Sequence, residues 1–111
     1  MKYNQGDIIL IPYPYSDLSK SKQRPAVIIS KNTANKQNYI VAKITSVIRN
    51  DKFSYPIEKE DIDRELMYKS EVRINELFTV SPTIIIKKFA TFNKQALINL
   101  TESIKTNISV D

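Results

Sequence analysis

The feature that most constrains the fold is a series of short apolar, β-branched runs with no helical pattern between them. Continuous apolar runs bounded by turn residues indicate β-strands. We expect strands at 8–13, 25–30 and 39–47, and shorter ones at 53–58, 70–74 and 83–89. Pro56 marks 53–58 as an edge strand or the site of a bulge, because proline cannot donate to a ladder. The lack of intervening helices excludes a doubly wound α/β fold.

The chain changes character near its end, where apolar residues recur at helical spacing. Residues 93–108 are expected to form one helix, with Asn93 as its N-cap and an apolar stripe of Ala96, Leu97, Leu100 and Ile104. Gly6-Asp7 marks a turn before the first strand. The pattern predicts a mainly β protein, a small and strongly curved antiparallel sheet or barrel followed by a C-terminal helix.

The length of 111 residues predicts a single domain spanning 1–111. The sequence has no linker, repeat or low-complexity segment. No apolar run approaches the roughly 20 residues that span a bilayer, and the first residues, MKYNQGD, lack the apolar stretch of a secretion signal. We therefore expect a cytoplasmic protein without a membrane partner.

The chain contains neither cysteine nor histidine. Disulfides and thiolate nucleophiles are excluded, no metal site or cofactor is expected, and acid–base chemistry falls to other polar side chains. The net charge of +5 favours a polyanionic partner such as nucleic acid. A lysine-rich surface without such a partner explains the charge equally well.

A polar segment between the first two strands is the most informative stretch. Residues 13–24 read as a surface loop on a rigid scaffold, the usual place for a binding site. Its tyrosines lie beside basic residues, an arrangement that offers stacking faces for unpaired bases and charge for phosphates. The same tyrosines, which alternate with prolines, would also serve simply to cover one end of the barrel.

Arg24 stands at the start of an expected strand. Because Pro25 follows, the backbone of Arg24 is held extended, and its guanidinium offers a rigid fork suited to a phosphate. Thr45 and Ser46 interrupt the next strand with two hydroxyls. They either satisfy local backbone groups, the commoner case, or lie near Arg24 if the two strands pair. An arginine beside a hydroxyl can stabilise an oxyanion on phosphorus.

These residues belong to an ordered pattern, GDIILIPYPYSDLSKSKQRPAVIIS at 6–30 followed by AKITS at 42–46. The pattern resembles the MazF/PemK family of type II toxin–antitoxin toxins, and SEVRINELFTV at 70–80 is also similar to its family counterpart. The resemblance implies an SH3-like barrel of the MazF/PemK/CcdB type. It also implies a homodimer, which would cover exposed strand edges and an apolar face.

The activity implied by the resemblance is metal-independent, sequence-selective cleavage of single-stranded messenger RNA. The matching antitoxin would lay a flexible acidic segment across the RNA groove and bind DNA together with the toxin. Carried onto this chain, the catalytic positions are Arg24, Thr45 and Ser46. The RNA 2′-hydroxyl would attack phosphorus to give a 2′,3′-cyclic phosphate, while Arg24 stabilises the developing charge and is a candidate proton donor.

The resemblance also implies a set of RNA-binding residues, namely Tyr13, Tyr15, Asp17, Ser19, Lys22, Gln23, Pro25 and Arg73. Arg73 has a second interpretation, a solvated charge on a strand. The general base is unassigned. The candidates are Asp17, Glu71 and Glu76.

The chain departs from the family pattern at two usual glycines, where it has Lys20 and Phe89-Ala90. Because of Lys20, the RNA sequence that the family cleaves cannot be transferred to this chain. Phe89-Ala90 indicates a bend of the barrel made without glycine. Two other functions stay open. A gyrase-poisoning toxin on a related barrel would not need Arg24 and Thr45 together, and a non-catalytic RNA- or protein-binding barrel would need neither.

Overall fold

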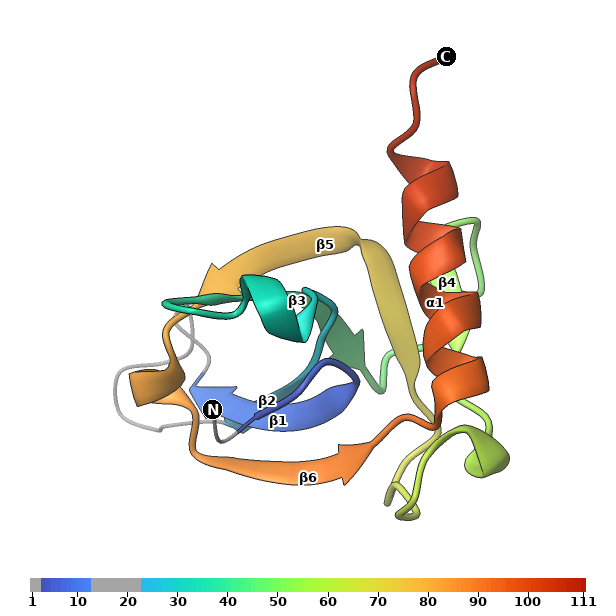
Figure 1. Cartoon of the computed structure of the whole chain (residues 1–111). Coiled ribbons are helices and arrows are strands. Elements are labelled where there is room, and N and C mark those ends of the chain that lie inside the picture. The colour runs from blue at the N-terminus through green and yellow to red at the C-terminus, as the bar shows by residue number, and fades with distance from the viewer. Residues whose placement is uncertain (1–2, 13–22) are drawn as a thin grey trace.

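The computed structural model describes residues 3–12 and 23–111 and contains, within them, one antiparallel sheet and a C-terminal helix (Figure 1). The strands are β1 Asp7–Pro12, β2 Gln23–Ile28, β3 Tyr39–Thr45, β4 Ser54–Pro56, β5 Glu71–Val80 and β6 Lys87–Thr91, and the helix is α1 Lys94–Asn107. Short 3-10 turns lie at η1 Asn32–Ala34, η2 Lys59–Asp61 and η3 Pro82–Ile84. The prediction of a mainly β protein is confirmed. In the part of the chain that the structure describes, no helix has the length and apolar character needed to cross a membrane.

The sheet runs in the order β4-β5-β3-β2-β1-β6, so β4 and β6 form its edges. It curves strongly, with β5 and β6 on opposite sides of β1, β2 and β3 (Figure 1). Pro56 ends β4, as expected of an edge strand. Because each strand pairs antiparallel with its neighbours, the start of β2 and the end of β3 lie at the same end of the sheet.

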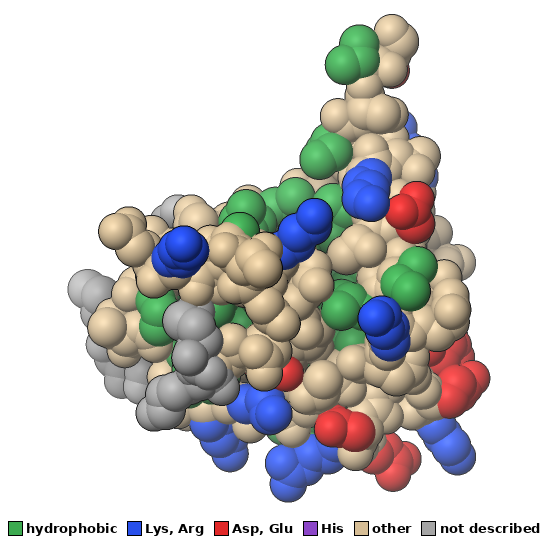
Figure 2. All heavy atoms as spheres, viewed as in Figure 1, with side chains coloured by type: hydrophobic (Ala, Val, Ile, Leu, Met, Phe, Trp, Pro, Cys, Tyr) green, Lys and Arg blue, Asp and Glu red, His purple; other side chains and the backbone are tan. Residues whose placement is uncertain are grey.

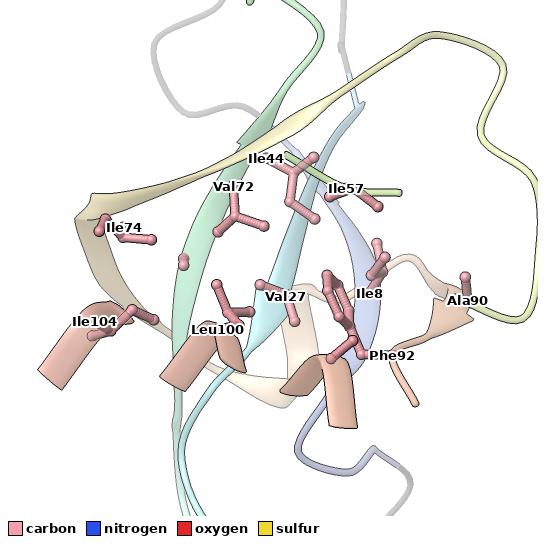
Figure 3. Packing of buried hydrophobic residues seen from close by; sticks show 12 residues of the cluster. Ile8, Val27, Ile44, Ile57, Val72, Ile74, Ala90, Phe92, Leu100 and Ile104 are labelled. Atoms are coloured by element: carbon pink, nitrogen blue, oxygen red, sulfur yellow. The ribbon is translucent and has the colours of Figure 1, made fainter. Parts of the chain in front are cut away.

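Both faces of the sheet are buried, which explains why its strands read as continuous apolar runs. Ile8 packs in a cluster against helix α1, while the next residue, Ile9, packs in a second cluster on the opposite face. Figure 3 shows the first cluster, in which α1 supplies Leu100 and Ile104. The second contains Ile9, Ile11, Ala26, Ile28, Tyr39, Val41 and Val80.

Helix α1 is capped as the sequence predicts. The Asn93 side chain accepts a hydrogen bond from the Ala96 backbone at 2.8 Å and donates one to the Glu60 carbonyl at 2.8 Å. The cap therefore satisfies an unpaired backbone donor of the first turn and ties the helix to η2. Ala96, Leu100 and Ile104 are buried along one face of α1.

The expected strand at 83–89 is wrong in its first half. Ser81 accepts a hydrogen bond from the Thr83 backbone at 3.3 Å, and Pro82 follows at the first position of η3. A proline with a serine cap starts a helical turn, although the isoleucines that come next have high strand propensity. Strand β6 begins only at Lys87.

Strand β5 is longer than the expected 70–74 because it continues through an irregularity in its pairing with β3. Ala42 lies opposite Leu77, whereas the next residue, Lys43, lies opposite Arg73. The intervening β5 residues bulge out of the ladder and bend the strand. The polar pair Asn75-Glu76 falls at this bend, which explains why the apolar pattern gave no sign of continuation.

Strand β6 bends without glycine, as the sequence indicated. Its partner residues in β1 are Ala90 for Ile8 and Lys88 for Ile9, so Phe89 is the extra residue of a bulge. This bulge places Phe89 at the pocket described below.

We predict that Gly6→Ala destabilises the protein by roughly 1–2 kcal/mol, the cost of left-handed backbone for a residue with a Cβ. Gly6 has φ +94°, and an added Cβ would lie 3.1 Å from Cδ2 of Leu97. Urea unfolding measures the effect, with Gln37→Ala, at an exposed position of ordinary φ, as control. Equal stability of the two variants would contradict the role of Gly6.

Candidate functional site

A pocket of about 520 Å³ opens at the end of the sheet where β2 begins and β3 ends. It brings together Gln23, Arg24 and Pro25 from β2 with Thr45 and Ser46. Five residues selected from the sequence thus share one pocket. Its other lining residues are Leu10, Lys43, Ile44, Val47, Arg49, Leu66, Met67, Tyr68, Ser70 and Phe89.

The register of β2 and β3 explains why Arg24 and Thr45 meet. Ala26 lies opposite Lys43, and extending the antiparallel register by two residues sets Arg24 opposite Thr45. The two strands do pair, so the condition under which Thr45 was expected near Arg24 is met. On its other side, β2 places Arg24 opposite Ile11 of β1.

Thr45 lines the pocket, and its hydroxyl has a local hydrogen bond. Its Oγ1 accepts a hydrogen bond from the Val47 backbone at 3.0 Å and so turns the chain at the end of β3. A hydroxyl that accepts a bond keeps its own proton to donate. Both interpretations of Thr45 therefore hold in part, because it satisfies a backbone group and also lines the pocket.

The charged side chains in the described lining of the pocket are all cationic. Arg24, Lys43 and Arg49 line it, and among the described lining residues none is Asp or Glu. Outside the lining, the carboxylate of Glu76 lies 3.5 Å from the Lys43 ammonium. Figure 2 shows Lys and Arg side chains spread widely over one face of the molecule, so net charge alone does not mark the site.

Aromatic and apolar side chains form another wall of the pocket. Tyr68 and Met67 are 67% and 85% exposed, and Phe89 reaches the pocket from the bulge of β6. An exposed ring beside cations suits a ligand that has both flat apolar groups and negative charge. Sequence reasoning missed Met67, Tyr68 and Arg49, because they lie in segments without any periodic pattern.

Arg73 is not among the residues that line the pocket, and its interpretation as a solvated charge is wrong. It is 3% exposed, and its guanidinium bonds three carboxylates. The nitrogen–oxygen distances are 2.7 Å to Glu71, 2.9 Å and 3.2 Å to Asp51, and 3.4 Å to Glu76. We call Asp51, Ser54, Glu71, Arg73 and Glu76 the Arg73 cluster.

Within the described residues, no set of three or more acidic side chains is placed so that it could hold a metal ion.

Glu71 connects the Arg73 cluster to the segment that follows β3. Its Oε1 accepts hydrogen bonds from the backbones of Arg49 and Asn50 at 3.3 and 3.4 Å, and its Oε2 accepts one from Ser54 at 2.7 Å. Burial by itself would raise the pKa of Glu71, but the bonds from Ser54, Arg73 and these backbone groups outweigh it and lower the pKa. Glu71 is thus an ionised anchor.

The two described candidates for the general base lie outside the pocket lining. Glu71 is 1% exposed, and Glu76 pairs with Arg73 and Lys43. Other sequence-predicted residues lie outside the described part of the chain. They are Tyr13, Tyr15, Asp17, Ser19 and Lys22, together with Lys20.

The chain belongs to the PemK-like, MazF-like toxins of type II toxin–antitoxin systems, because the model of this family matches residues 4–108. The resemblance noted in the sequence is thereby confirmed. No curated protein sequence matches the chain.

Solved structures with the same fold include toxins alone and toxins bound to antitoxins. The MazE–MazF complex of Deinococcus radiodurans aligns with a TM-score of 0.77 and 11% identity over 100% of both chains. The toxin MazF-mt6 of Mycobacterium tuberculosis gives 0.74 and 19% over 95% of this chain and 98% of its own. A mycobacterial endoribonuclease in complex with its cognate antitoxin gives 0.76 and 11% over 98% and 99%. The TM-scores establish a common fold, and at these identities they establish the fold alone.

We predict that acid removes a stabilising contribution of Asp51 between about pH 4 and pH 2. The Arg73 guanidinium hydrogen-bonds Asp51 and lowers its pKa from 3.8 to about 2. A lowered folded-state pKa stabilises the protein above the unfolded pKa, and this contribution is lost as pH falls through the folded pKa.

The free energy of unfolding of Asp51→Asn should therefore fall less steeply between pH 4 and 2 than that of the unsubstituted protein. Urea titrations at several pH values measure the slope. Glu102→Gln, on the exposed side of α1, serves as control. Identical slopes for Asp51→Asn and the unsubstituted protein would contradict the Arg73–Asp51 ion pair.

Proposed function

We propose that the protein is an endoribonuclease toxin that cleaves single-stranded RNA at the pocket between β2 and β3. The observation that carries the proposal is that Arg24, Thr45 and Ser46 line one positively charged pocket. Family membership supports it, as does the common fold with a mycobacterial endoribonuclease. A volume of about 520 Å³ accommodates a nucleotide-sized group.

The proposed chemistry uses a nucleophile from the substrate. The RNA 2′-oxygen forms a bond to the adjacent phosphorus and releases its proton, while the bond from phosphorus to the 5′-oxygen breaks and that oxygen takes up a proton. The products are a 2′,3′-cyclic phosphate and a 5′-hydroxyl. The reaction requires no protein nucleophile, which suits a chain that lacks cysteine and histidine.

Arg24 is the proposed stabiliser of the transition state. Charge builds up on the non-bridging oxygens of phosphorus, and a guanidinium binds two such oxygens with a fixed fork of donors. The extended backbone before Pro25 holds this group at the mouth of the pocket. The guanidinium is itself rigid and planar, so its donors keep their relative directions when a phosphate binds.

Thr45 and Ser46 are the proposed hydroxyl donors beside Arg24. Since Thr45 already accepts the Val47 backbone bond, its proton is free to point toward a phosphate oxygen. Ser46 follows at an exposed position of the same turn. Two donors of this type complement the guanidinium on a second side of the phosphate.

Recognition of flanking bases is assigned to the remaining lining residues. Gln23 offers amide donors and acceptors for base edges, Pro25 a flat apolar contact, and Tyr68 an exposed ring for stacking. Roles for Tyr13, Tyr15, Asp17, Ser19 and Lys22 stay predictions from the sequence. Arg73 has no place in the proposed contacts, because its guanidinium is buried among carboxylates.

We predict that Arg24→Ala lowers the rate of RNA cleavage on the order of 10²–10³-fold, the usual loss when one preorganised donor is removed. Thr45→Val, which keeps the shape but removes the hydroxyl, should also lower the rate. The assay incubates purified protein with a labelled single-stranded RNA in EDTA and identifies the product ends. Lys36→Ala, an exposed cation away from the pocket, is the control.

Three results would overturn the nuclease proposal. Cleavage unaffected by Arg24→Ala would remove the proposed centre. Tight RNA binding without any cut would indicate a non-catalytic module. Inhibition of purified DNA gyrase without RNA cleavage would indicate a gyrase poison.

The proposed partners are a cognate antitoxin and a second copy of the chain. An acidic flexible segment of an antitoxin would complement the positive pocket, and related toxin structures contain antitoxins. A second copy would cover apolar side chains exposed in the single chain, which include Ile40, Val47, Ile48, Phe78, Ile84 and Ile86.

We predict a symmetric homodimer at micromolar concentration, measured by sedimentation equilibrium. Charged substitutions at Ile40 and at Ile86, made one at a time, should weaken at least one dimer contact if these exposed side chains form it. Lys36→Glu is the control for added negative charge. A monomer at this concentration would contradict the dimer, while leaving the pocket chemistry untouched.

A further inference from the structure

We propose that Arg49 is a second phosphate-binding residue of the pocket, and that the buried Arg73 cluster is the device that positions it. The inference rests on the proposed RNA substrate but not on cleavage. Arg49 would contact a phosphate other than the one that reacts at Arg24. Asp51, Glu71 and Arg73 act through Arg49 and are positioning residues.

The placement of Arg49 supports contact with a ligand. It lines the pocket with Arg24 and Lys43, and it is exposed to solvent. Lys43 approaches Glu76, whereas Arg49 has no carboxylate partner among the described residues. Its guanidinium is therefore available for an anion that enters the pocket.

The backbone at Arg49 is fixed although its side chain is exposed. The amides of Arg49 and Asn50 donate to Oε1 of Glu71 at 3.3 and 3.4 Å. Glu71 is 1% exposed and stands in β5 directly opposite Thr45. Glu71 thus holds the backbone of Arg49 at a fixed distance from Thr45, its partner in the ladder.

Asp51 fixes the same segment from its other end. Its carboxylate makes two bonds to the Arg73 guanidinium, at 2.9 and 3.2 Å, and it also accepts the Phe53 backbone at 2.9 Å. Arg73 in turn bonds Glu71 at 2.7 Å. Residues 49–51 are therefore held at both ends by one buried arginine, and Asn50 between them has the left-handed φ of 51°.

The lining favours RNA over an acidic peptide as the ligand of Arg49. Tyr68 and Phe89 line the same pocket, and Tyr68 is 67% exposed. An exposed ring such as that of Tyr68 stacks on unpaired bases, while neighbouring cations bind the phosphates that connect them. An acidic peptide would use the cations and leave the rings without a matching group.

The first experiment measures the affinity for a single-stranded RNA with 2′-O-methyl groups, which cannot be cleaved by 2′-oxygen attack. Arg49→Ala should weaken binding about tenfold, as expected for one hydrogen-bonded charged contact. The slope of log affinity against log salt should become shallower by about 0.7, the contribution of one phosphate in a single strand. Lys105→Ala removes the same charge from the exposed side of α1 and should change both quantities little.

The second experiment tests whether Asp51 positions Arg49, by asking whether Asp51→Asn tightens or weakens RNA binding. Asp51→Asn removes a negative charge near the pocket, so electrostatics alone would tighten RNA binding. If Asp51 positions Arg49, binding instead weakens and the salt slope becomes shallower. The same substitution made in Arg49→Ala should then add no further loss. Glu102→Gln removes an equal charge from α1 and is the control.

Folding is monitored by thermal melting at pH 7. If Asp51→Asn is not folded, Ser54→Ala carries the same double-mutant test, because Ser54 bonds both Glu71 and the Asp51 backbone. Its loss of affinity should likewise vanish in the Arg49→Ala background.

The outcomes separate this inference from the proposed nuclease activity. Binding that depends on Arg49, without cleavage of ordinary RNA, upholds the inference and overturns the nuclease. Cleavage with equal RNA affinity for Arg49→Ala and Lys105→Ala overturns the assignment of Arg49 alone, and tighter binding by Asp51→Asn overturns positioning. If Arg49→Ala binds a glutamate-rich peptide more weakly but binds RNA as before, Arg49 is a peptide-binding residue instead.

Discussion

The ion pair between Arg73 and Glu71 is the interaction on which the rest of the site depends. Both side chains are almost completely buried, and a buried charge is tolerated only when its partners satisfy it. Here Arg73 also bonds the Asp51 carboxylate and the Ser54 hydroxyl, and Glu71 also accepts backbone amides. Breaking a pair of this kind leaves an uncompensated charge in the interior, which costs roughly 3–5 kcal/mol in known cases. The cluster therefore holds the end of β3, where the hydroxyls of the pocket lie.

The fold and the pocket have one geometric cause. Apolar clusters on both faces bury most side chains in the middle of β1, β2 and β3, whereas Arg24 and Thr45 lie near strand ends. Antiparallel pairing brings the beginning of β2 and the end of β3 to the same end of the sheet. Arg24 and Thr45 are close for this reason, although twenty residues separate them in sequence.

Sequence patterns predicted those features that depend on local chemistry or on strand pairing. The Asn93 cap is of this kind. So are Pro56, expected at an edge or a bulge and found at an edge, and the nearness of Arg24 to Thr45, which was expected if their strands paired. The isoleucines after Pro82 were placed in a strand because local propensity did not reveal the serine-capped turn. Arg73 and Tyr68 could not be placed, because their surroundings depend on the bend of β5 and on an irregular segment. A single sequence carries no periodic signal for either.

The two borders of the sheet bear on how the protein behaves when it accumulates in a cell. Strand β4 is only three residues long and ends in proline, and β6 begins with the exposed pair Lys87-Lys88. Short, proline-containing or lysine-bearing borders resist the addition of a foreign strand and hence amyloid-like stacking. In a chain so rich in isoleucine, these two borders are the features of the fold that oppose fibril formation.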